Sequence, residues 1–197
     1  MSNIHGKQYA MNAISPMKPW KTWIVRVFFF YLGRFPSAGG DLVNLSFIHF
    51  ARWIIVRRDE FPQIGSEISR SRLRYDYLIF FSNFNGTWNQ YIDAFSAVLS
   101  KGLNFIWRWS EKFPGAVPVT PFKQYILRGQ FWTDYYYTAY PHATTNDVKA
   151  AHRVVAALDD LEAQSGKSAA EFETAYRRFL LAVQTDLGST GEAPVGT

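Results

Sequence analysis

The imidazole of His49 has the clearest potential for chemistry in this sequence, because it stands in an otherwise apolar run, residues 46–56. A neutral imidazole that faces a cavity can act as an acid or a base, or can ligate a haem iron. The alternative is a core histidine that is hydrogen-bonded to the backbone and has no chemical role. The other histidines, at positions 5, 142 and 152, do not stand at the spacing of metal ligands. We therefore predict no metal site.

Two residues close to His49 are further candidates for a site. Arg52 would lie on the opposite face of the same strand, where it either pairs with Asp76 or binds an anion. Trp53 would lie on the face of His49 and line the same cavity. The sequence contains no Walker loop, no GxGxxG, HExxH or GxSxG pattern and no cysteine. P-loop, Rossmann, zincin, serine-hydrolase and cysteine chemistry are therefore not predicted.

The net charge of +5 is distributed unevenly along the 197 residues. Residues 1–75 carry 11 basic and 4 acidic side chains, residues 76–147 carry 5 of each, and residues 148–197 carry 5 basic and 7 acidic. A basic N-terminal third attracts phosphates, acidic lipids or other anions, unless it is only a solubilising surface. The apolar run 23–32 is too short to cross a bilayer and includes Arg26. We expect a cytoplasmic protein, with membrane association as an option.

The hydrophobic pattern predicts a mixed order of strands and helices. Period-two and continuous apolar runs predict strands at 9–17, 46–56, 75–84 and 135–140. Helical spacing predicts a helix at 20–32, a long amphipathic helix at 87–109 with a capping box at Thr87 and Gln90, and one helical turn near 122–127. Two more helices start near Thr144 and Ser168. We divide the chain into an α+β domain (1–143), a helical extension (144–187) and a disordered tail (188–197).

This order of elements is the βαββαβ plan of a ferredoxin-like antiparallel sheet with a C-terminal helical extension. The helices of that plan cover only one face of the sheet, whereas the strands at 46–56 and 75–84 are apolar on both faces. The second face needs a cover, and the economical source is a second copy of the chain. We therefore expect a homodimer.

Three segments carry a resemblance to a known group of proteins. They are Phe47-Ile48-His49-Phe50-Ala51-Arg52-Trp53, Leu78-Ile79-Phe80-Phe81-Ser82-Asn83-Phe84-Asn85-Gly86, and the tyrosine-rich stretch that ends in Tyr140-Pro141. Over roughly residues 9–162 the chain resembles largely uncharacterised bacterial proteins that are similar to the dimeric α+β barrel superfamily, which includes dye-decolorising peroxidases, chlorite dismutases and small cofactor-free monooxygenases. The resemblance implies a dimeric barrel with an internal cavity. The Gly-x-x-Asp-Gly signature of the peroxidases is absent, which puts haem peroxidase activity in doubt.

The predicted topology brings several loops to one end of the sheet, which we call the basic end. Its cations come from three connections and are Lys18, Lys21, Arg57, Arg58, Arg70, Arg72, Arg74, Lys112, Lys123 and Arg128. We expect this end, with the aromatic loop 105–132, to bind an anionic amphiphile or an acidic aromatic molecule. The opposite end would collect neutral polar groups, among them Asn83, Asn85, Gly86 and His142. We include Asn83 and Asn85, together with Tyr137 from the last predicted strand, among the ligand-binding residues.

Two functions from different classes remain open. The first is a ligand-binding or oxidoreductase-like barrel dimer with an apolar cavity, in which haem is an optional cofactor. The second is a non-enzymatic interaction or membrane-surface protein that uses Trp20, Trp23, residues 28–30 and the basic loops. Nucleic acid is not expected, because the aromatic residues fall on core stripes and no basic, aromatic sheet platform is visible.

Overall fold

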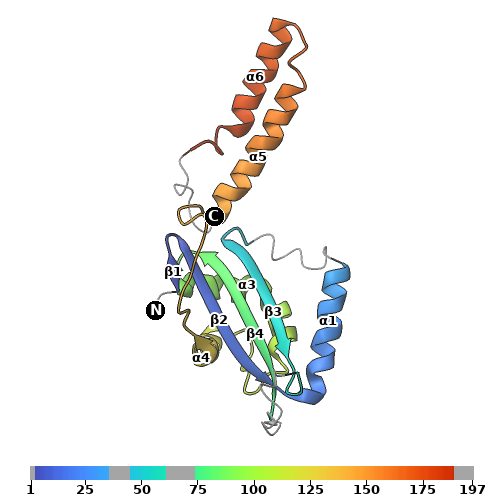
Figure 1. Cartoon of the computed structure of the whole chain (residues 1–197), viewed down its shortest axis with the longest axis vertical. Coiled ribbons are helices and arrows are strands. Elements are labelled where there is room, and N and C mark those ends of the chain that lie inside the picture. Colours follow the sequence, from blue (N-terminus) through green and yellow to red (C-terminus); the bar gives the residue numbers. More distant parts are fainter. Residues whose placement is uncertain (1–2, 36–44, 61–73, 189–197) are drawn as a thin grey trace, which may run out of the picture.

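The computed structural model describes residues 3–35, 45–60 and 74–188 and has an α+β fold (Figure 1). The described strands form an antiparallel five-stranded sheet in the order β1-β2-β4-β3, and β5 also pairs with β2. The strands are β1 (Ile4–His5), β2 (Gln8–Met17), β3 (Ile48–Val56), β4 (Asp76–Asn85) and β5 (Gln130–Phe131). The helices are the 3-10 turn η1 (Pro19–Lys21), α1 (Thr22–Arg34), α3 (Trp88–Trp107), α4 (Val119–Gly129), α5 (Thr145–Glu162) and α6 (Ala169–Val183).

The predicted hairpin of two apolar strands is present, and β3 pairs with β4 from Ile48 to Val56. The predicted first strand is β2, which pairs with β4 along its whole length. Side chains of a strand alternate between its two faces. On one face, here called the helix face, the β2 and β4 side chains are buried, as with Met11 and Phe80. On the other, the open face, Ile14, Ile79 and Ile54 stand side by side on β2, β4 and β3.

Helix α3 covers the helix face, and the contact between them is mainly aromatic. The capping box predicted at Thr87 and Gln90 starts this helix. Phe80 of β4 stacks on Phe95 and meets Trp107 edge-on, with ring centroids 5.8 and 5.4 Å apart. Three further aromatic residues extend the cluster, namely Trp53, Phe84 and Tyr91. The predicted amphipathic helix is therefore confirmed, and its stripe forms the core.

Helix α1 lies beside β3 at the edge of the sheet (Figure 1). It packs there through Phe28, whose ring centroid is 4.4 Å from that of Phe105, and through Phe29, which contacts Trp53.

The single turn expected near 122–127 is instead the three-turn helix α4, which packs Phe122 and Ile126 into the core. Among the described residues, no helix combines the length and the apolar character that a membrane crossing requires.

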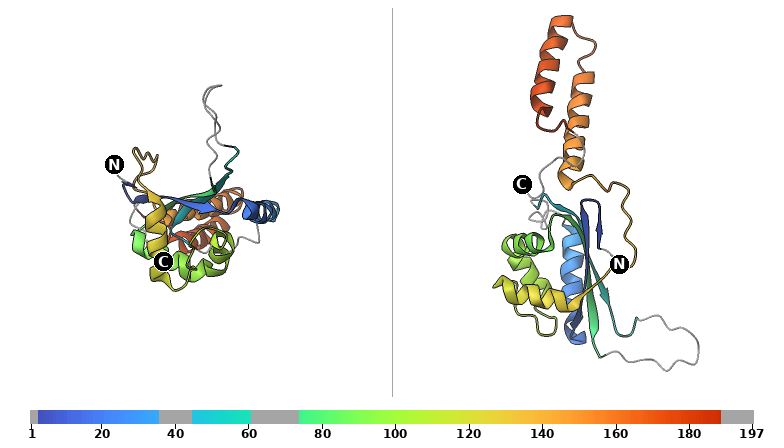
Figure 2. Two further views of the ribbon diagram at one scale, coloured as in Figure 1. Left: turned by 90° about the horizontal axis from the view of Figure 1, so that it is seen from below. Right: turned by 90° about the vertical axis from the view of Figure 1, so that its left-hand side faces the viewer.

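The fourth strand predicted at 135–140 was wrong, because these residues are irregular and only Gln130 and Phe131 pair with β2. The reason is competition for the outer edge of β2. The chain begins with a tight hairpin in which β1 takes the edge at Gln8 and Tyr9, and Gly6 makes the turn with φ +60°. Residues 132–140 then cross the open side of the sheet near β2 (Figure 2), where Asn12 donates a hydrogen bond of 2.8 Å to Thr133.

The last two helices pack on each other and project beyond the end of the sheet (Figures 1 and 2). Both predicted starts are confirmed, because Thr144 forms a capping box with Asp147, and Ser168 forms one with Glu171. The predicted tail lies outside the described residues apart from Gly188.

Replacing Phe80 with alanine should lower the free energy of unfolding by about 3–5 kcal/mol, since it leaves a cavity beneath α3 that neighbouring rings cannot fill. Urea unfolding followed by far-UV circular dichroism measures the change. Phe30→Ala is the matched control, because 77% of that ring is exposed and its loss should change stability by less than about 0.5 kcal/mol. Equal effects of the two substitutions would contradict the packing described for the core.

Candidate functional site

Four segments of the chain meet at the basic end of the sheet. Strand β2 ends there at Met17 and leads into η1 and α1, while β3 ends and β4 starts beside them. The chain after α3 returns to the same end, because Met17 bridges to Ser110 and the Glu111 backbone N–H donates a 2.8 Å hydrogen bond to the Pro16 carbonyl. The predicted convergence of these loops is therefore found for the described residues.

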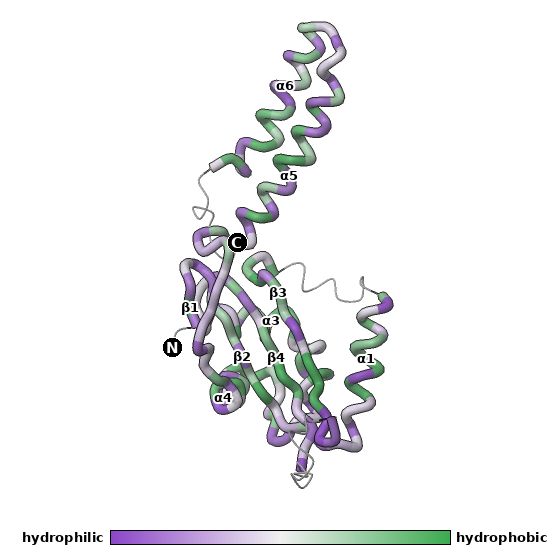
Figure 3. The backbone as a smooth tube through the Cα atoms, in the orientation of Figure 1, coloured by the Kyte–Doolittle hydropathy of each residue, from purple (hydrophilic) through white to green (hydrophobic). Residues whose placement is uncertain are grey.

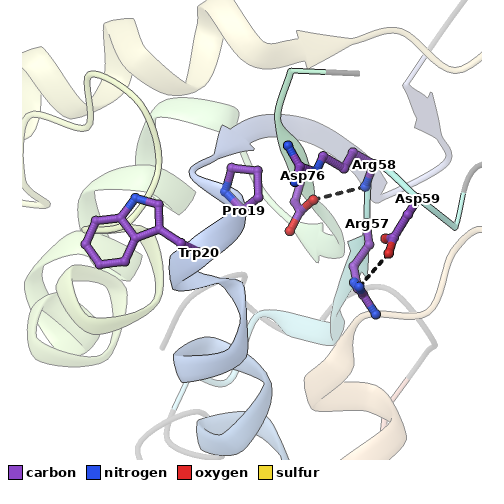
Figure 4. Close-up of a pocket in the computed structure, with 6 residues that line it drawn as sticks. All are labelled: Pro19, Trp20, Arg57, Arg58, Asp59 and Asp76. Atoms are coloured by element: carbon purple, nitrogen blue, oxygen red, sulfur yellow. Dashed lines mark hydrogen bonds and ion pairs between the residues drawn. The ribbon is translucent and has the colours of Figure 1, made fainter. Parts of the chain in front are cut away.

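Two shallow pockets open at this end, with volumes of about 230 and 380 Å³. Pro19 and Arg57 line both. The smaller pocket adds Trp20, Arg58, Asp59 and Asp76, and the larger adds Thr22, Trp23, Arg26 and Val27. Figure 4 shows the arginines and acids of the smaller pocket on one side of Pro19 and Trp20 on the other. Guanidinium groups and large apolar side chains thus border the same space.

The Asp76 carboxylate joins the three elements that form the pockets. It is 2% exposed, accepts a hydrogen bond from the Thr22 hydroxyl at the start of α1, and accepts another, of 2.9 Å, from the Arg58 backbone N–H after β3. A carboxylate at the first turn of a helix is also favoured by the positive end of the helix dipole. Asp76 therefore fixes α1 against the end of the β3–β4 hairpin. The predicted ion pair between Asp76 and Arg52 is not formed.

Acidic neighbours offset part of the positive charge at this end. Arg57 lies 2.6 Å from Asp59 and 3.4 Å from Glu60, and Lys18 lies 3.6 Å from Glu111. Glu60 also lies 3.7 Å from Arg26. The excess of cations is therefore smaller than the sequence suggested.

Other cations of the basic end differ in their surroundings. Within the described part of the chain, no carboxylate pairs with the Arg58 guanidinium, and Lys21 lies over the rings of Trp20 and Trp109 at 4.5 Å from each. Arg74 lies over the Tyr75 ring at 5.4 Å. Lys123 is paired instead with Asp93 of α3, at 2.7 Å. The predicted ligand-binding residues Arg70 and Arg72 lie outside the described residues.

A stripe of exposed aromatic and aliphatic side chains follows α1 away from the pockets. Trp20 and Trp23 are 68% and 63% exposed, and Val27, Phe30 and Tyr31 continue the stripe at helical spacing. Residues 18–35 contain four cations and no acidic residue. Hydrophobic positions run along most of this helix (Figure 3). The outer side of α1 therefore combines apolar surface with positive charge.

His49 lies at the other end of β3, at a β-bulge between Ile48 and Phe50. Burial lowers the pKa of its imidazole, and the neighbouring Asn85 side chain opposes this in part. Its Nε2 atom is buried without a hydrogen-bond partner. His49 lines neither of the two described pockets, which open at the far end of the strand. A haem held by His49 therefore stays a prediction.

The amides near His49 anchor the chain that leads into the last two helices. Asn85 donates a hydrogen bond to the Lys7 carbonyl and accepts one from the Thr145 backbone N–H, both at 2.9 Å. Asn83 bonds to the Tyr136 hydroxyl, which donates to Gln8 at 2.9 Å. The two asparagines predicted as ligand-binding groups thus have structural partners, whereas Tyr137 is exposed.

The two candidates near His49 in sequence are separated by the sheet. Trp53 lies on the helix face within the aromatic core, with its ring 4.9 Å from Phe80. Arg52 lies on the open face, with its guanidinium 4.9 Å from the Phe81 ring. His49, Arg52 and Trp53 all lie outside the linings of the two described pockets.

Sequence reasoning missed the residues that organise the basic end, namely Thr22, Asp59, Glu60 and the anchoring role of Asp76. The contact of the Thr22 hydroxyl with Asp76 joins residues 54 positions apart, so no local pattern in the sequence indicates it. No three acidic or histidine residues of the described chain come together in a way that could hold a metal ion.

Asp76→Ala should lower the free energy of unfolding by about 2–5 kcal/mol, because the buried Thr22 hydroxyl and the Arg58 N–H lose their acceptor. Chemical denaturation of the purified variant measures this change. Asp93→Ala is the control, since it removes only the exposed ion pair with Lys123 and should cost less than about 1 kcal/mol. A small effect at Asp76 would contradict its anchoring role.

The lowered pKa of His49 predicts a dependence of stability on pH. The unfolded chain takes up a proton at this imidazole below about pH 6.5, whereas the folded chain does so only at lower pH. The stabilisation is therefore complete above pH 6.5 and declines as the pH falls. Urea unfolding at pH 7.5 and pH 5.5 should show a smaller decline for His49→Gln than for the wild type. Equal declines would show that another group is responsible.

No protein-family model matches this chain, and no curated protein or solved structure is significantly similar to it. Function is therefore inferred from the residues and geometry of this chain alone.

Proposed function

We propose that the basic end binds an anionic amphiphile, a molecule with an acidic head and an apolar or aromatic body. The observation that supports this function most directly is the pair of pockets that share Arg57 and Pro19, with arginines and tryptophans along their borders. Guanidinium groups bind carboxylates and phosphates through charge-assisted hydrogen bonds. Tryptophan rings bind apolar and aromatic groups over a large area.

The charges around the pockets indicate where the acidic head would bind. Arg58 borders the smaller pocket, and its guanidinium has no acidic partner among the described residues, although its backbone N–H bonds to Asp76. Arg57 already has two acidic partners, so an incoming anion would compete with Asp59 and Glu60 for it. The head therefore belongs near Arg58, and the apolar body belongs along Trp20, Trp23 and Val27.

The exposed stripe on α1 favours a second candidate, in which the amphiphile is a lipid within an anionic bilayer. Helices that lie at a membrane surface carry tryptophan and phenylalanine on one side with flanking lysine and arginine. Residues 18–35 have this composition, and Phe30 is 77% exposed, so its ring is not part of the core. The two candidates share their chemistry and differ in whether the ligand is free or part of a membrane.

The arrangement of the sheet supports, in addition, the ferredoxin-like plan and a homodimer. The predicted first, third and second strands are adjacent in the order β2-β4-β3, as that plan requires. The open face carries the isoleucine row of Ile14, Ile79 and Ile54 together with Phe50, more than half exposed. A second copy that packs on this face would bury these side chains. The resemblance to dimeric α+β barrels likewise stays a prediction.

Arg57→Glu combined with Arg58→Glu should weaken the binding of dodecanoate and of 2-naphthoate by at least about tenfold, since the charge-assisted contact of Arg58 and the neighbouring positive charge of Arg57 are replaced by repulsion. Tryptophan fluorescence and isothermal titration calorimetry measure the affinities below the micelle concentration. Lys101→Glu is the control, because this exposed lysine of α3 lines neither pocket and its reversal changes the net charge only. If the double variant binds as tightly as the wild type, the basic end is not the binding site.

Cosedimentation with phosphatidylcholine vesicles, with and without phosphatidylglycerol, separates the two sources of the ligand. Trp23→Ala with Phe30→Ala should reduce binding to the anionic vesicles if the bilayer is the ligand. Tyr135→Ala is the matched control, as an exposed aromatic residue outside α1. Binding of the soluble acids without binding to vesicles would restrict the function to free amphiphiles. Absence of both would refute the proposal.

A further inference from the structure

A carboxylate of the chain itself lies between the two arginines of the larger pocket. The Oε1 atom of Glu60 is 3.4 Å from Nη1 of Arg57 and 3.7 Å from Nη1 of Arg26. Both arginines line this pocket. One acidic oxygen thus stands between two guanidinium groups, which is a position that the carboxylate of a ligand can also occupy.

A short turn after β3 places Glu60 at this position. The Glu60 backbone N–H donates a hydrogen bond of 3.0 Å to the Arg57 carbonyl and so closes a four-residue turn. Within the turn, the Arg58 N–H is held by the buried Asp76 carboxylate. Because the turn brings residue 60 back beside residue 57, the Glu60 side chain reaches Arg57 and also Arg26 of α1.

Arg57 uses its two terminal nitrogens for different carboxylates. Its Nη2 atom lies 2.6 Å from Asp59 (Figure 4), whereas its Nη1 atom faces Glu60. Asp59 borders the smaller pocket and not the larger one. An anion that replaced Glu60 would therefore leave the contact with Asp59 intact, and Arg57 would keep its orientation.

The contacts of Glu60 are weak enough to be exchanged. The side chains of Glu60, Arg26 and Arg57 are all about half exposed. Water and salt screen ion pairs at such sites, so these pairs contribute little to stability. A ligand with an apolar body would in addition bury surface against Trp23, which lines the same pocket. Such a ligand therefore has an advantage over the internal carboxylate.

We propose that the larger pocket has an acid-binding position of its own, between Arg26 and Arg57, at which the head of an apolar carboxylic acid displaces Glu60. This position rests on the proposed function of the basic end and specifies a carboxylic acid as its ligand. The head lies between the two guanidinium groups and the body lies along Trp23. Glu60 acts as an internal competitor. The position is separate from the Arg58 guanidinium, which borders the smaller pocket.

Glu60→Gln should tighten the binding of dodecanoate by about three- to tenfold, since the competing charge is lost while the side chain keeps its size. Isothermal titration calorimetry at low salt, below the micelle concentration, measures the affinity. Glu111→Gln is the matched control: it also removes one carboxylate from the basic end, but its partner Lys18 lines neither pocket. Equal affinities of the wild type and Glu60→Gln, or an equal gain from Glu111→Gln, would overturn the proposal.

Two further backgrounds locate the head of the ligand. The gain from Glu60→Gln should persist in an Arg58→Gln background and disappear in an Arg26→Gln background. Loss of the gain in the first, or its persistence in the second, would refute a position between Arg26 and Arg57. Dodecanoate binding that does not respond to Glu60→Gln would refute this position alone, whereas absence of binding in the wild type and in every variant would refute the function of the basic end as well.

Discussion

The structure depends on the packing of α3 against the helix face of the sheet. The Phe80 ring contacts Phe95, Trp107 and Trp53, so a single side chain of β4 joins α3 to the central and edge strands. Trp53 then contacts Phe29, which fixes α1 at the edge. The position of α1, and with it the pockets at the basic end, follows from this aromatic cluster. Rings of this size bury a large area and pack with defined geometry, which explains the large share of the core that α3 supplies.

Most of the elements could be predicted because their signals are local. The strands at β2, β3 and β4 have continuous or alternating apolar patterns, and the caps at Thr87, Thr144 and Ser168 identify helix starts. The tyrosine-rich segment could not be assigned in this way, since its strand-like composition competes with β1 for the same edge of β2. Such competition between distant segments leaves no trace in a local pattern.

The candidate site was only partly predictable, for a similar reason. The end of the sheet at which the cations gather follows from the order of the elements, but their pairing with Asp59, Glu60 and Glu111 depends on loop geometry. Periodicity placed His49 with Trp53 on one face, and the bulge at Ile48 to Phe50 changes the register there. Alternation along a strand does not reveal a bulge, so the direction of the His49 side chain could not be predicted from it.

The placement of α1 also bears on how the sheet is protected from its neighbours. Strand β3 is the last strand of the sheet in the described chain, so its outer backbone groups have no strand beside them. An open edge of this kind can recruit a strand from another molecule. Helix α1 lies alongside that edge (Figure 1) and is held by Phe28 and Phe29. Any ligand or membrane that engages the outer side of α1 must therefore leave the helix in place, because a helix that swung outward would expose a strand edge prone to aggregation.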